Sequence, residues 1–446
     1  MQIVKGPTTI SPLGFLPSFR KNPLVFLENL QNEYEHEDVI VYRLLNRTYY
    51  LVLNPSMIRE ALITKSHYFH KSKPFQELKS LVGEGLLTSE EEFHLQQRRL
   101  MQPAFTKQHI QTYADDMVSI TKDHISSWDI GEKRQINMDM MNITLSIITK
   151  TMFDMDIREG HEKVGKHIDT ALKTVTKRIR SIFKVPHSWP TKQNVTYSEA
   201  LDAINQVIYE IIAHRREQKD IDREDLLSIL MKARDEKSGE GMTDEQLRDE
   251  VMTIFLAGHE TTANALTWSF YLLSQHPEKT EKVHEEIETV LEGRLPSYED
   301  MGKLTYTQSV VWESLRLYPP AWAFGREVIR DVSIGEYEFS KGDTLIMSPY
   351  IIQRSSKYFP NPTVFEPERF EDGSIKPASD FIYFPFGGGP RVCIGNHFAM
   401  LEAVLVMGTI LQRYRLELCE DCPEVAPDPL ITLRPKNGIR MVVSEH

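Results

Sequence analysis

Cysteine is scarce in this sequence, and long hydrophobic runs are missing. The 446 residues include three cysteines, Cys393, Cys419 and Cys422, which are too few for a disulfide framework. We therefore expect a reducing, cytoplasmic environment. The first twenty residues contain three prolines and no apolar run, so they look like neither a signal peptide nor a membrane anchor.

Positive charge is also in short supply. The formal net charge is −12, which argues against nucleic acid or an anionic membrane as the main partner. Hydrophobic residues make up 41% and charged residues 26% of the chain, a composition typical of a globular enzyme with a large core. Length alone would favour about two or three domains.

One cysteine lies in an unusual stretch, FPFGGGPRVCIG, which spans Phe384–Gly395. Three consecutive glycines allow a sharp turn and a close approach of a flat group. A helical pattern from Asn396 to about Arg413 follows, so its free N–H groups and dipole favour a thiolate at Cys393. Arg391 adds a fixed cation for an anionic ligand.

A thiolate at Cys393 has three interpretations. A nucleophile needs a general base within reach, but His397 is four residues further on, one turn down the helix. A buried cysteine with no role is the second interpretation. The third is an axial ligand of haem iron, with Arg391 on a haem propionate.

The spacing around this cysteine resembles a known signature. Phe386, Gly389, Arg391, Cys393 and Gly395 match F-x-x-G-x-R-x-C-x-G, the haem-binding signature of the cytochromes P450. The resemblance implies that these residues bind haem b and that the thiolate is the axial iron ligand.

A second motif lies in a long predicted helix from Asp244 to Gln275, which Thr243 and Gln246 open as a capping box. Its middle reads AGHETT, residues 257–262. A glycine costs roughly 1 kcal/mol against alanine in a helix, and a buried carboxylate costs more, so this stretch indicates a functional site.

The AGHETT stretch resembles the family pattern [AG]-G-x-[DE]-T-[ST]. The resemblance implies that Ala257 and Gly258 lie over the haem and that Gly258 leaves room for it. It also implies that Glu260 and Thr261 deliver protons during dioxygen activation. A zinc-protease H-E-x-x-H site is excluded, because Ala263 stands where the second histidine is needed.

Three more residues are implied as haem propionate partners. The family pattern W-x-x-x-R aligns with His94 and Arg98, and an imidazole N–H can still donate where tryptophan is usual. The alternative for His94 is a plain surface histidine. Arg326, at the end of the run PPAWAFGR, is the third partner, with an exposed strand arginine as the alternative.

Two further sets of residues follow from the resemblance. Glu313, Arg316 and Arg369 match a buried charge triad that has a structural role, although an exposed E-x-x-R pair alone would mean nothing. The substrate pocket candidates, for which ordinary packing is the alternative, are Phe75, Leu78, Val82, Leu87, Ala321, Trp322, Ala323, Phe324 and Thr432.

Two features carry weaker signals. Arg47 in a predicted strand turn could anchor a substrate carboxylate, but a solvated turn residue is the plainer interpretation. Cys419 and Cys422 form one C-x-x-C without a second pair or histidines, so we interpret it as a surface turn rather than a zinc site.

The expected fold is the cytochrome P450 fold, mainly α with a smaller β-rich part. Haem is expected between the Asp244–Gln275 helix and the Asn396–Arg413 helix. We predict a single domain over residues 1–446, because the motifs must converge on one cofactor. Its β-rich part lies mainly in residues 36–54, 319–350 and 414–446.

The resemblance implies a haem-thiolate monooxygenase that inserts one oxygen atom from O2 into a C–H bond of an apolar small molecule. A fatty acid, a terpenoid or a steroid is the expected substrate class. The chain ends about 50 residues after Cys393, so we expect electrons to come from a separate ferredoxin or flavodoxin and its NAD(P)H reductase. We also expect a monomer. A peroxide-driven peroxygenase is one alternative, although Glu260 and Thr261 argue against it. A haem sensor or carrier without turnover is the other.

Overall fold

The computed structural model describes residues 4–154, 161–181, 185–217, 225–234 and 239–445. The chain divides into two compact units. The first unit comprises Met1–Phe75, Gln308–Cys393 and Val425–Asn437, and the second comprises Gln76–Thr307, Ile394–Glu424 and Gly438–His446. That residues 1–446 form a single domain stays a prediction.

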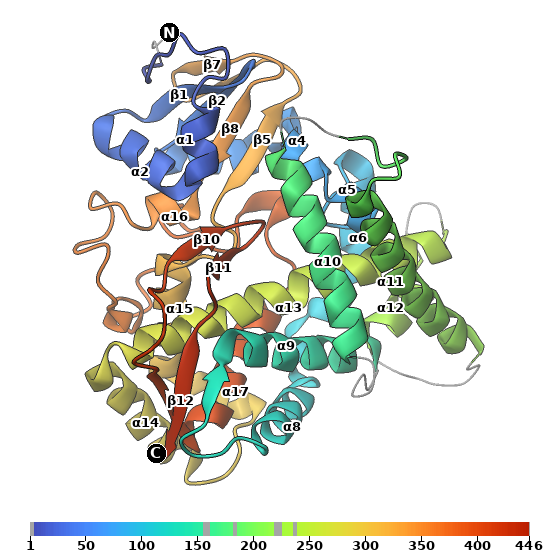
Figure 1. Cartoon of the computed structure of the whole chain (residues 1–446), viewed down its shortest axis with the longest axis vertical. Helices are drawn as coiled ribbons and strands as arrows, with labels where there is room; N and C mark the ends of the chain where they lie inside the picture. The colour runs from blue at the N-terminus through green and yellow to red at the C-terminus, as the bar shows by residue number, and fades with distance from the viewer. Residues whose placement is uncertain (1–3, 155–160, 182–184, 218–224, 235–238, 446) are drawn as a thin grey trace. The chain divides into compact units, whose positions relative to one another are not determined.

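A five-stranded sheet organises the first unit (Figure 1). Its strands, in spatial order, are β1 (Val39–Leu44), β2 (Arg47–Val52), β8 (Thr344–Met347), β5 (Phe324–Val328) and β3 (Phe69–Lys71). β2 and β8 pair in parallel, and the other pairs are antiparallel. The sheet therefore joins strands that lie almost 300 residues apart in the chain, roughly from residue 50 to residue 345.

The first hairpin shows why these residues form a sheet. β1 and β2 pair from Leu44 with Arg47 to Val39 with Val52, so Leu45 and Asn46 form a two-residue turn. Leu45 has a φ of +56°, as a tight hairpin turn requires. Arg47 is exposed beside this turn, which agrees with a solvated turn residue.

Helix α2 (Pro23–Glu33) contributes to the core of the first unit. Leu24, Leu27 and Leu30 recur at three-residue spacing and are all buried in that core. The helix begins where the Asn22 side chain accepts hydrogen bonds from the Leu24 and Val25 amides.

The other elements of the first unit are short or lie at its margins. They are α1 (Leu16–Lys21), α3 (Pro55–Arg59), the π-helix η1 (Glu60–Thr64), η2 (Ser66–Tyr68), α4 (Lys73–Gln76), α15 (Thr305–Leu317), β6 (Val332–Ile334), β7 (Tyr337–Phe339), α16 (Pro349–Ile352), η5 (Pro367–Phe370), η6 (Gly389–Arg391), β10 (Pro427–Pro429) and β11 (Leu433–Pro435).

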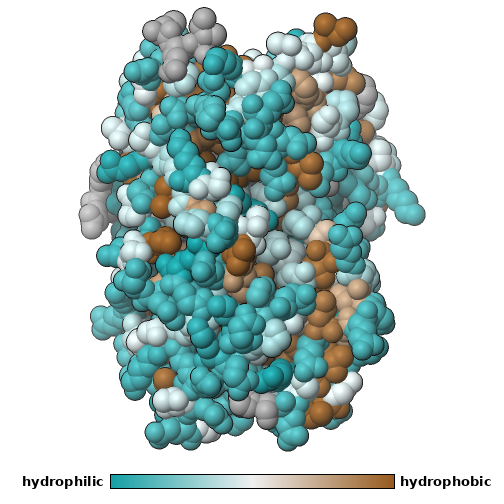
Figure 2. All heavy atoms as spheres, turned by 90° about the vertical axis from the view of Figure 1, so that its left-hand side faces the viewer, coloured by the Kyte–Doolittle hydropathy of each residue, from teal (hydrophilic) through white to brown (hydrophobic). Residues whose placement is uncertain are grey.

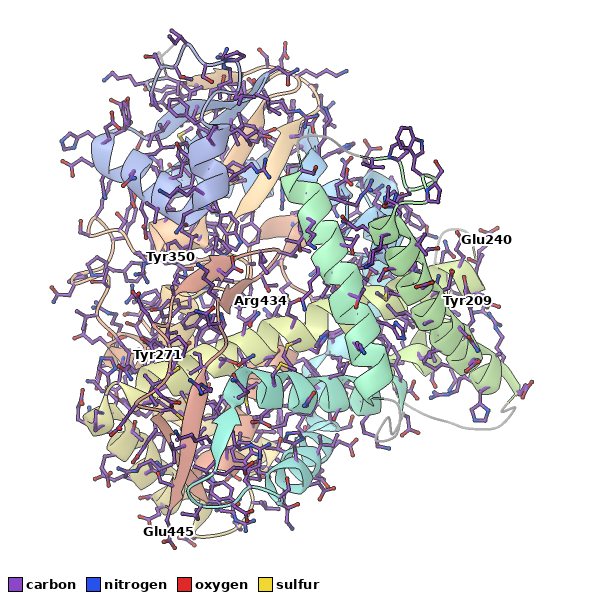
Figure 3. All side chains as sticks on the ribbon, in the orientation of Figure 1. Tyr209, Glu240, Tyr271, Tyr350, Arg434 and Glu445 are labelled. Carbon is purple, nitrogen blue, oxygen red and sulfur yellow. The ribbon has the colours of Figure 1, made fainter. Side chains whose placement is uncertain are left out.

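Helix α13 (Asp244–Ser274) runs through the second unit (Figure 1). It packs against α9 (Ile136–Phe153), α11 (Lys192–Glu217) and α17 (Asn396–Leu411). Side chains on all sides of its central turns are buried, as expected of a helix inside a large core. Near its C-terminal end, Tyr271 (Figure 3) lies edge-on to the ring of Trp268, with 5.9 Å between ring centroids.

The second unit is mainly helical, with one small sheet in the order β4-β12-β9. Its remaining elements are α5 (Lys79–Val82), α6 (Glu91–Met101), η3 (Gln102–Phe105), α7 (Lys107–Gln111), α8 (Ala114–Ile125), β4 (Lys133–Gln135), α10 (His161–Arg180), α12 (Leu226–Lys232), α14 (Pro277–Leu291), η4 (Tyr298–Gly302), β9 (Tyr414–Leu418) and β12 (Arg440–Glu445).

The predicted elements agree with the structure except at short strands. α13 starts at the predicted residue and ends one residue before the predicted Gln275, and α17 ends at Leu411 instead of Arg413. The predicted β-rich ranges hold the other strands but miss β3 and β4. Each missed strand has three residues, too few to show an alternating pattern.

The surface agrees with the acidic, polar composition. On the face shown in Figure 2, hydrophilic side chains predominate and hydrophobic ones occur in small groups. Within the residues that the structure describes, no helix combines the length and the hydrophobicity needed to cross a membrane.

The C-x-x-C turn differs in one respect from its interpretation as a surface feature. The Cys422 amide donates to the Cys419 carbonyl at 2.9 Å, which closes the predicted turn after β9. The Cys419 side chain, however, is buried, because this residue directly follows the paired strand β9. Both thiols are free.

The capping box of α13 yields a stability prediction. The Gln246 amide donates to the Thr243 hydroxyl at 3.2 Å, and the Thr243 amide donates to the Gln246 side chain at 2.8 Å. We expect Thr243→Ala to lower the free energy of unfolding by about 1 kcal/mol, because the Gln246 amide loses its acceptor. Urea unfolding measures this, with Thr243→Ser as the matched control. Equal stability of the two variants would contradict the contribution of the box.

Candidate functional site

The loop that carries Cys393 belongs to the first unit and is held by backbone hydrogen bonds. The Cys393 amide donates to the Phe386 carbonyl at 3.0 Å, and the Val392 amide donates to the Gly389 carbonyl at 3.0 Å. Phe386 is half-buried and lies edge-on to Trp312 of α15, with 6.0 Å between centroids. The Cys393 side chain is exposed and forms no disulfide, so the loop presents the thiol rather than burying it.

Gly389 fixes the position of this loop through a close contact that the sequence did not predict. Its φ is +68°, a conformation that favours glycine. A Cβ at this position would lie 2.0 Å from the carbonyl oxygen of Leu62 in η1. The loop backbone therefore packs directly on the π-helix, and no larger residue fits without a shift.

The predicted propionate partners occur in both units. Arg391, which ends η6, and Arg326 on β5 are half-buried in the first unit. His94 and Arg98 lie one turn apart on α6 in the second unit. His94 is only 3% exposed, which argues against a plain surface histidine, and Arg98 is half-buried.

The AGHETT stretch forms the middle of α13, as predicted. The Thr261 hydroxyl donates to the Ala257 carbonyl at 2.7 Å, and the Thr262 hydroxyl donates to the Gly258 carbonyl at 3.3 Å. Glu260 is 2% exposed, whereas Thr261 is half-buried. Two adjacent threonines that bond to carbonyls four residues back favour a local bend of the helix.

Gly258 has a packing role that differs from the predicted one. A Cβ on Gly258 would lie 2.7 Å from Cδ1 and 2.9 Å from Cγ1 of Ile148 on α9. The Thr144 hydroxyl of α9 also donates to the His259 carbonyl at 3.0 Å. Close packing of α9 on α13 therefore gives one reason for the glycine, and the expectation that Gly258 leaves room for the haem stays a prediction.

Glu313 and Arg316 form a fully buried ion pair in the first unit. Arg316 Nε lies 2.7 Å from Glu313 Oε2, and Arg316 Nη2 lies 2.7 Å from Oε1. Arg369 Nε lies 3.5 Å from Oε1, so all three predicted charges meet. Burial raises the pKa of Glu313, and the hydrogen bond and charge of Arg316 oppose that shift.

Gln353 connects this ion pair to the cysteine loop, and sequence reasoning missed it. Its side-chain amide donates to the Leu315 and Arg316 carbonyls, both at 3.1 Å. Its side-chain oxygen accepts from the Phe384 amide at 3.0 Å, at the start of the loop. Gln353 is fully buried, and a single glutamine belongs to no sequence motif by which to find it.

Similarity to known proteins decides the family. The family model for cytochrome P450 matches residues 4–442. Cyclooctat-9-en-7-ol 5-monooxygenase of Streptomyces melanosporofaciens is 33% identical over 92% of this chain and 89% of its own length. Cyclooctatin synthase of the same organism is 33% identical over 89% of this chain and 86% of its own. Pentalenene oxygenase of Streptomyces avermitilis is 30% identical over 98% and 96%.

The chain belongs to the cytochrome P450 family. The predicted family, the mainly α fold and the monooxygenase class are thereby confirmed. As a cytochrome P450, it uses a haem-thiolate cofactor and dioxygen, receives electrons from redox partners and acts on a hydrophobic substrate.

The residues of this cytochrome P450 fit such a cofactor. The exposed thiol of Cys393 can supply one axial ligand. Within the described ranges, no group of three or more His, Cys, Asp or Glu side chains could hold a bare metal ion. A single thiolate therefore suits a metal whose other ligands come with a cofactor, as in haem.

The pocket candidates of the cytochrome P450 differ in burial. Leu78 and Val82 are fully buried, so these two fit ordinary packing better than a pocket wall. Phe75, Leu87 and residues 321–324 are half-buried and retain surface for a substrate. Thr432 is buried next to Leu433, whose amide donates to the Pro320 carbonyl at 3.0 Å.

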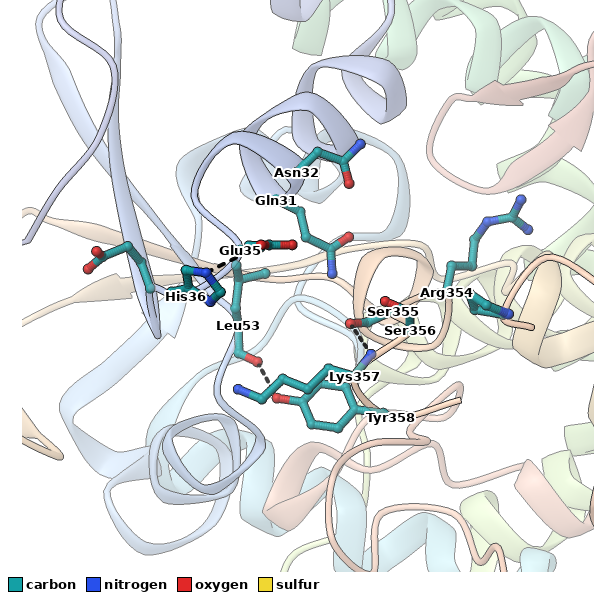
Figure 4. A pocket seen from close by; sticks show the side chains of 12 residues that line it. Gln31, Asn32, Glu35, His36, Leu53, Arg354, Ser355, Ser356, Lys357 and Tyr358 are labelled. Carbon is teal, nitrogen blue, oxygen red and sulfur yellow. Dashed lines mark hydrogen bonds and ion pairs between the residues drawn. The ribbon is translucent and has the colours of Figure 1, made fainter. Parts of the chain in front are cut away.

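A pocket elsewhere in the first unit has no evident link to this chemistry (Figure 4). It has a volume of about 470 Å³ and lies between the end of α2 and the loop of residues 354–358. Its lining is largely polar, with Glu35, His36, Arg354 and Lys357 among its side chains. None of the predicted site residues lines it.

Two buried carboxyl groups in the second unit escaped sequence reasoning. Glu402 on α17 is fully buried, and neither of its oxygens makes a hydrogen bond within the described residues. Burial raises its pKa well above the usual range, although the nearby Thr262 hydroxyl lowers it. Burial also raises the pKa of Glu250 on α13 to about 8, with the Leu86 amide opposing the shift and the Asp249 charge adding to it. A lone glutamate in an apolar run was the available signal for Glu402.

The contact at Gly258 gives a prediction that separates packing from helix propensity. Alanine is better than glycine in a helix by about 1 kcal/mol, whereas overpacking costs about 1–3 kcal/mol. We expect Gly258→Ala to lower the melting temperature and Ile148→Val, which removes Cδ1, to restore part of the loss. Strictly additive effects of the two substitutions in thermal unfolding would contradict the contact.

The pKa of Glu250 gives a prediction about pH. The folded protein keeps this proton up to about pH 8, whereas an unfolded glutamate loses it near its ordinary pKa of 4.5. The free energy of unfolding therefore falls as pH rises through this window. We expect Glu250→Gln to remove this dependence, so its stability relative to the parent protein increases from pH 5 to pH 8.5. Urea unfolding across that range tests it, and a constant difference would contradict it.

Proposed function

We propose that this cytochrome P450 oxidises a terpenoid by inserting one oxygen atom from dioxygen into a C–H bond. The observation that carries the oxidation chemistry is the exposed thiol of Cys393 in a loop fixed by backbone bonds. The terpenoid class rests on the relatives named cyclooctat-9-en-7-ol 5-monooxygenase and pentalenene oxygenase. The half-buried apolar residues 321–324 support an apolar substrate.

In this proposal Cys393 binds the iron of haem b. Arg391 and Arg326 from the first unit, and His94 and Arg98 from the second, donate to the propionates. Charged hydrogen bonds of this kind contribute about 1.5–3 kcal/mol each. When bound, a thiolate-ligated haem supplies the activation of dioxygen. Ala257, Phe386 and Gly395 complete the cofactor-binding residues.

Glu260 and Thr261 move protons in this proposal. The Thr261 hydroxyl already donates to the Ala257 carbonyl, and its two lone pairs remain available to accept from water. Glu260 is buried and adjacent in sequence, so it can hold a proton and pass it towards the Thr261 hydroxyl. This pair has no use in a sensor or a carrier, and no observation favours a peroxygenase.

The finer assignments of partner and location are also proposals. We assign a separate ferredoxin or flavodoxin with its NAD(P)H reductase as the electron source, and a monomeric state. The cytoplasmic location is supported by the three cysteines, none of which forms a disulfide.

The first test is the carbon monoxide difference spectrum of the reduced protein. We expect the strongly red-shifted Soret band of thiolate-ligated haem, and Cys393→Ser should lose it. Thr261→Ala should keep the band but divert reducing equivalents to hydrogen peroxide. Thr267→Ala is the matched control, because the Thr267 hydroxyl makes the same kind of bond, to the Ala263 carbonyl at 2.6 Å on the same helix.

Either of two results would overturn the proposal. A parent protein without the red-shifted band would remove the haem-thiolate assignment. Full coupling of substrate oxidation in Thr261→Ala would remove the proton relay. Spectral titration with terpenoid hydrocarbons, fatty acids and steroids then decides the substrate class, and tighter binding of a fatty acid or a steroid would contradict the terpenoid assignment.

A further inference from the structure

Three consecutive ionisable residues of α13 hold the segment that runs from the end of α5 into the loop before α6. Arg248 Nη2 donates to the Leu81 carbonyl at 2.9 Å. The Asp249 carboxylate accepts from the Glu84 amide at 2.8 Å. The Glu250 carboxyl accepts from the Leu86 amide at 3.0 Å. Each bond joins a side chain of the helix to the backbone of the loop.

These three side chains leave the helix in different directions, because consecutive residues of an α-helix are rotated by about 100°. The three bonds reach successive points of the segment from Leu81 to Leu86 and place its peptide groups against α13.

Two glycines permit this close approach. A Cβ on Gly83, whose φ is +61°, would lie 2.1 Å from the carboxylate of Asp249. A Cβ on Gly85 would lie 2.2 Å from the Thr253 hydroxyl and 2.7 Å from the Asp249 carbonyl. The Thr88 hydroxyl donates to the Gly83 carbonyl at 2.6 Å and closes the loop on itself.

Arg248, Asp249 and Glu250 form a clamp on this segment, and Arg248 is itself held by two neighbouring side chains. Arg248 also donates to Asp249 Oδ1 at 2.9 Å and, through Nε, to Asn205 of α11 at 2.7 Å. Its side chain is 8% exposed and that of Asp249 is 13% exposed, so water competes little for these bonds. Glu250 is 1% exposed.

We propose that Arg248, Asp249 and Glu250 are positioning residues that set the shape of the substrate pocket by fixing the backbone of residues 81–86. Leu87 directly follows the amide that Glu250 holds, and of the three pocket candidates on this loop it is the half-buried one. A shift of the Leu86 peptide therefore moves Leu87. This inference rests on the proposed function in that Leu87 borders the substrate.

The experiment uses the haem-loaded protein and two readouts. Hydrogen exchange followed by mass spectrometry reports the protection of the Glu84 and Leu86 amides. Titration with n-butylimidazole and n-octylimidazole, which bind haem iron through nitrogen, reports the pocket through the ratio of the two dissociation constants. The ratio cancels effects on the iron itself, and neither readout requires the substrate to be known.

Glu250→Ala removes the acceptor, whereas Glu250→Gln retains an oxygen for the Leu86 amide. We expect the alanine variant to speed exchange of peptides covering residues 81–88 and to change the ratio by about three- to tenfold, as expected for one lost hydrogen bond. The glutamine variant should restore both values to those of the parent protein.

Arg248→Met should have the same effects as Glu250→Ala. Its matched control is Arg216→Met, because Arg216 of α11 pairs with Asp244 of α13 at the surface, Nε to Oδ1 at 3.0 Å, away from the loop. The control should leave both readouts unchanged.

Unchanged exchange in both Glu250→Ala and Arg248→Met would overturn the clamp. Faster exchange with an unchanged ratio would overturn its role in shaping the pocket. Failure of the proposed function is a separate result. A parent protein that binds both imidazoles but oxidises no terpenoid would refute the terpenoid assignment, whereas the clamp is decided by the exchange rates and the ratio of dissociation constants.

Discussion

The buried ion pair between Glu313 and Arg316 holds the part of the first unit that presents Cys393. Arg316 also donates to the carbonyls of Gln353 and Pro362 at 2.7 Å and of Val364 at 3.0 Å. An unpaired charge at this depth would destabilise the protein by several kcal/mol, so each of these partners has to stay in place. The ion pair thus fixes Gln353, and Gln353 fixes the first residue of the cysteine loop. The position of the thiol depends on charges that take no part in chemistry.

Helix α13 holds together the second unit as the ion pair holds part of the first, but its own stability comes from a different source. Its central turns contain residues that weaken an isolated helix, namely a glycine, a buried acid and two threonines that bond back to the helix. Its N-terminal turns contain three ionisable side chains that bind another segment's backbone. Both regions are stabilised by neighbours rather than by helix propensity, because packing from α9, α11 and α17 surrounds them. The helix can therefore carry polar groups in an interior that would otherwise reject them.

The sequence predicted those features of the fold and the family that depend on a short motif or on a local rule of helix formation. The spacing around Cys393 predicted the haem-thiolate family, and Thr243 with Gln246 predicted the first residue of α13. Contacts between distant segments were not predictable in this way. Ile148 against Gly258 and Leu62 against Gly389 join residues more than 100 positions apart, and no local pattern names the partner. The roles of the site residues are matched to motifs, and their convergence on one haem stays a prediction.

The order of the chain through the two units has a consequence for recombination between related genes. The chain passes from one unit to the other after Phe75, Thr307, Cys393, Glu424 and Asn437. No single crossover can therefore exchange one whole unit with a relative and leave the other intact. The crossing after Cys393 separates this cysteine from the helix that follows it, so a chimera joined at this peptide bond combines a cysteine loop from one parent with α17 from another. Exchange of one whole unit between relatives requires a crossover at each of these five positions.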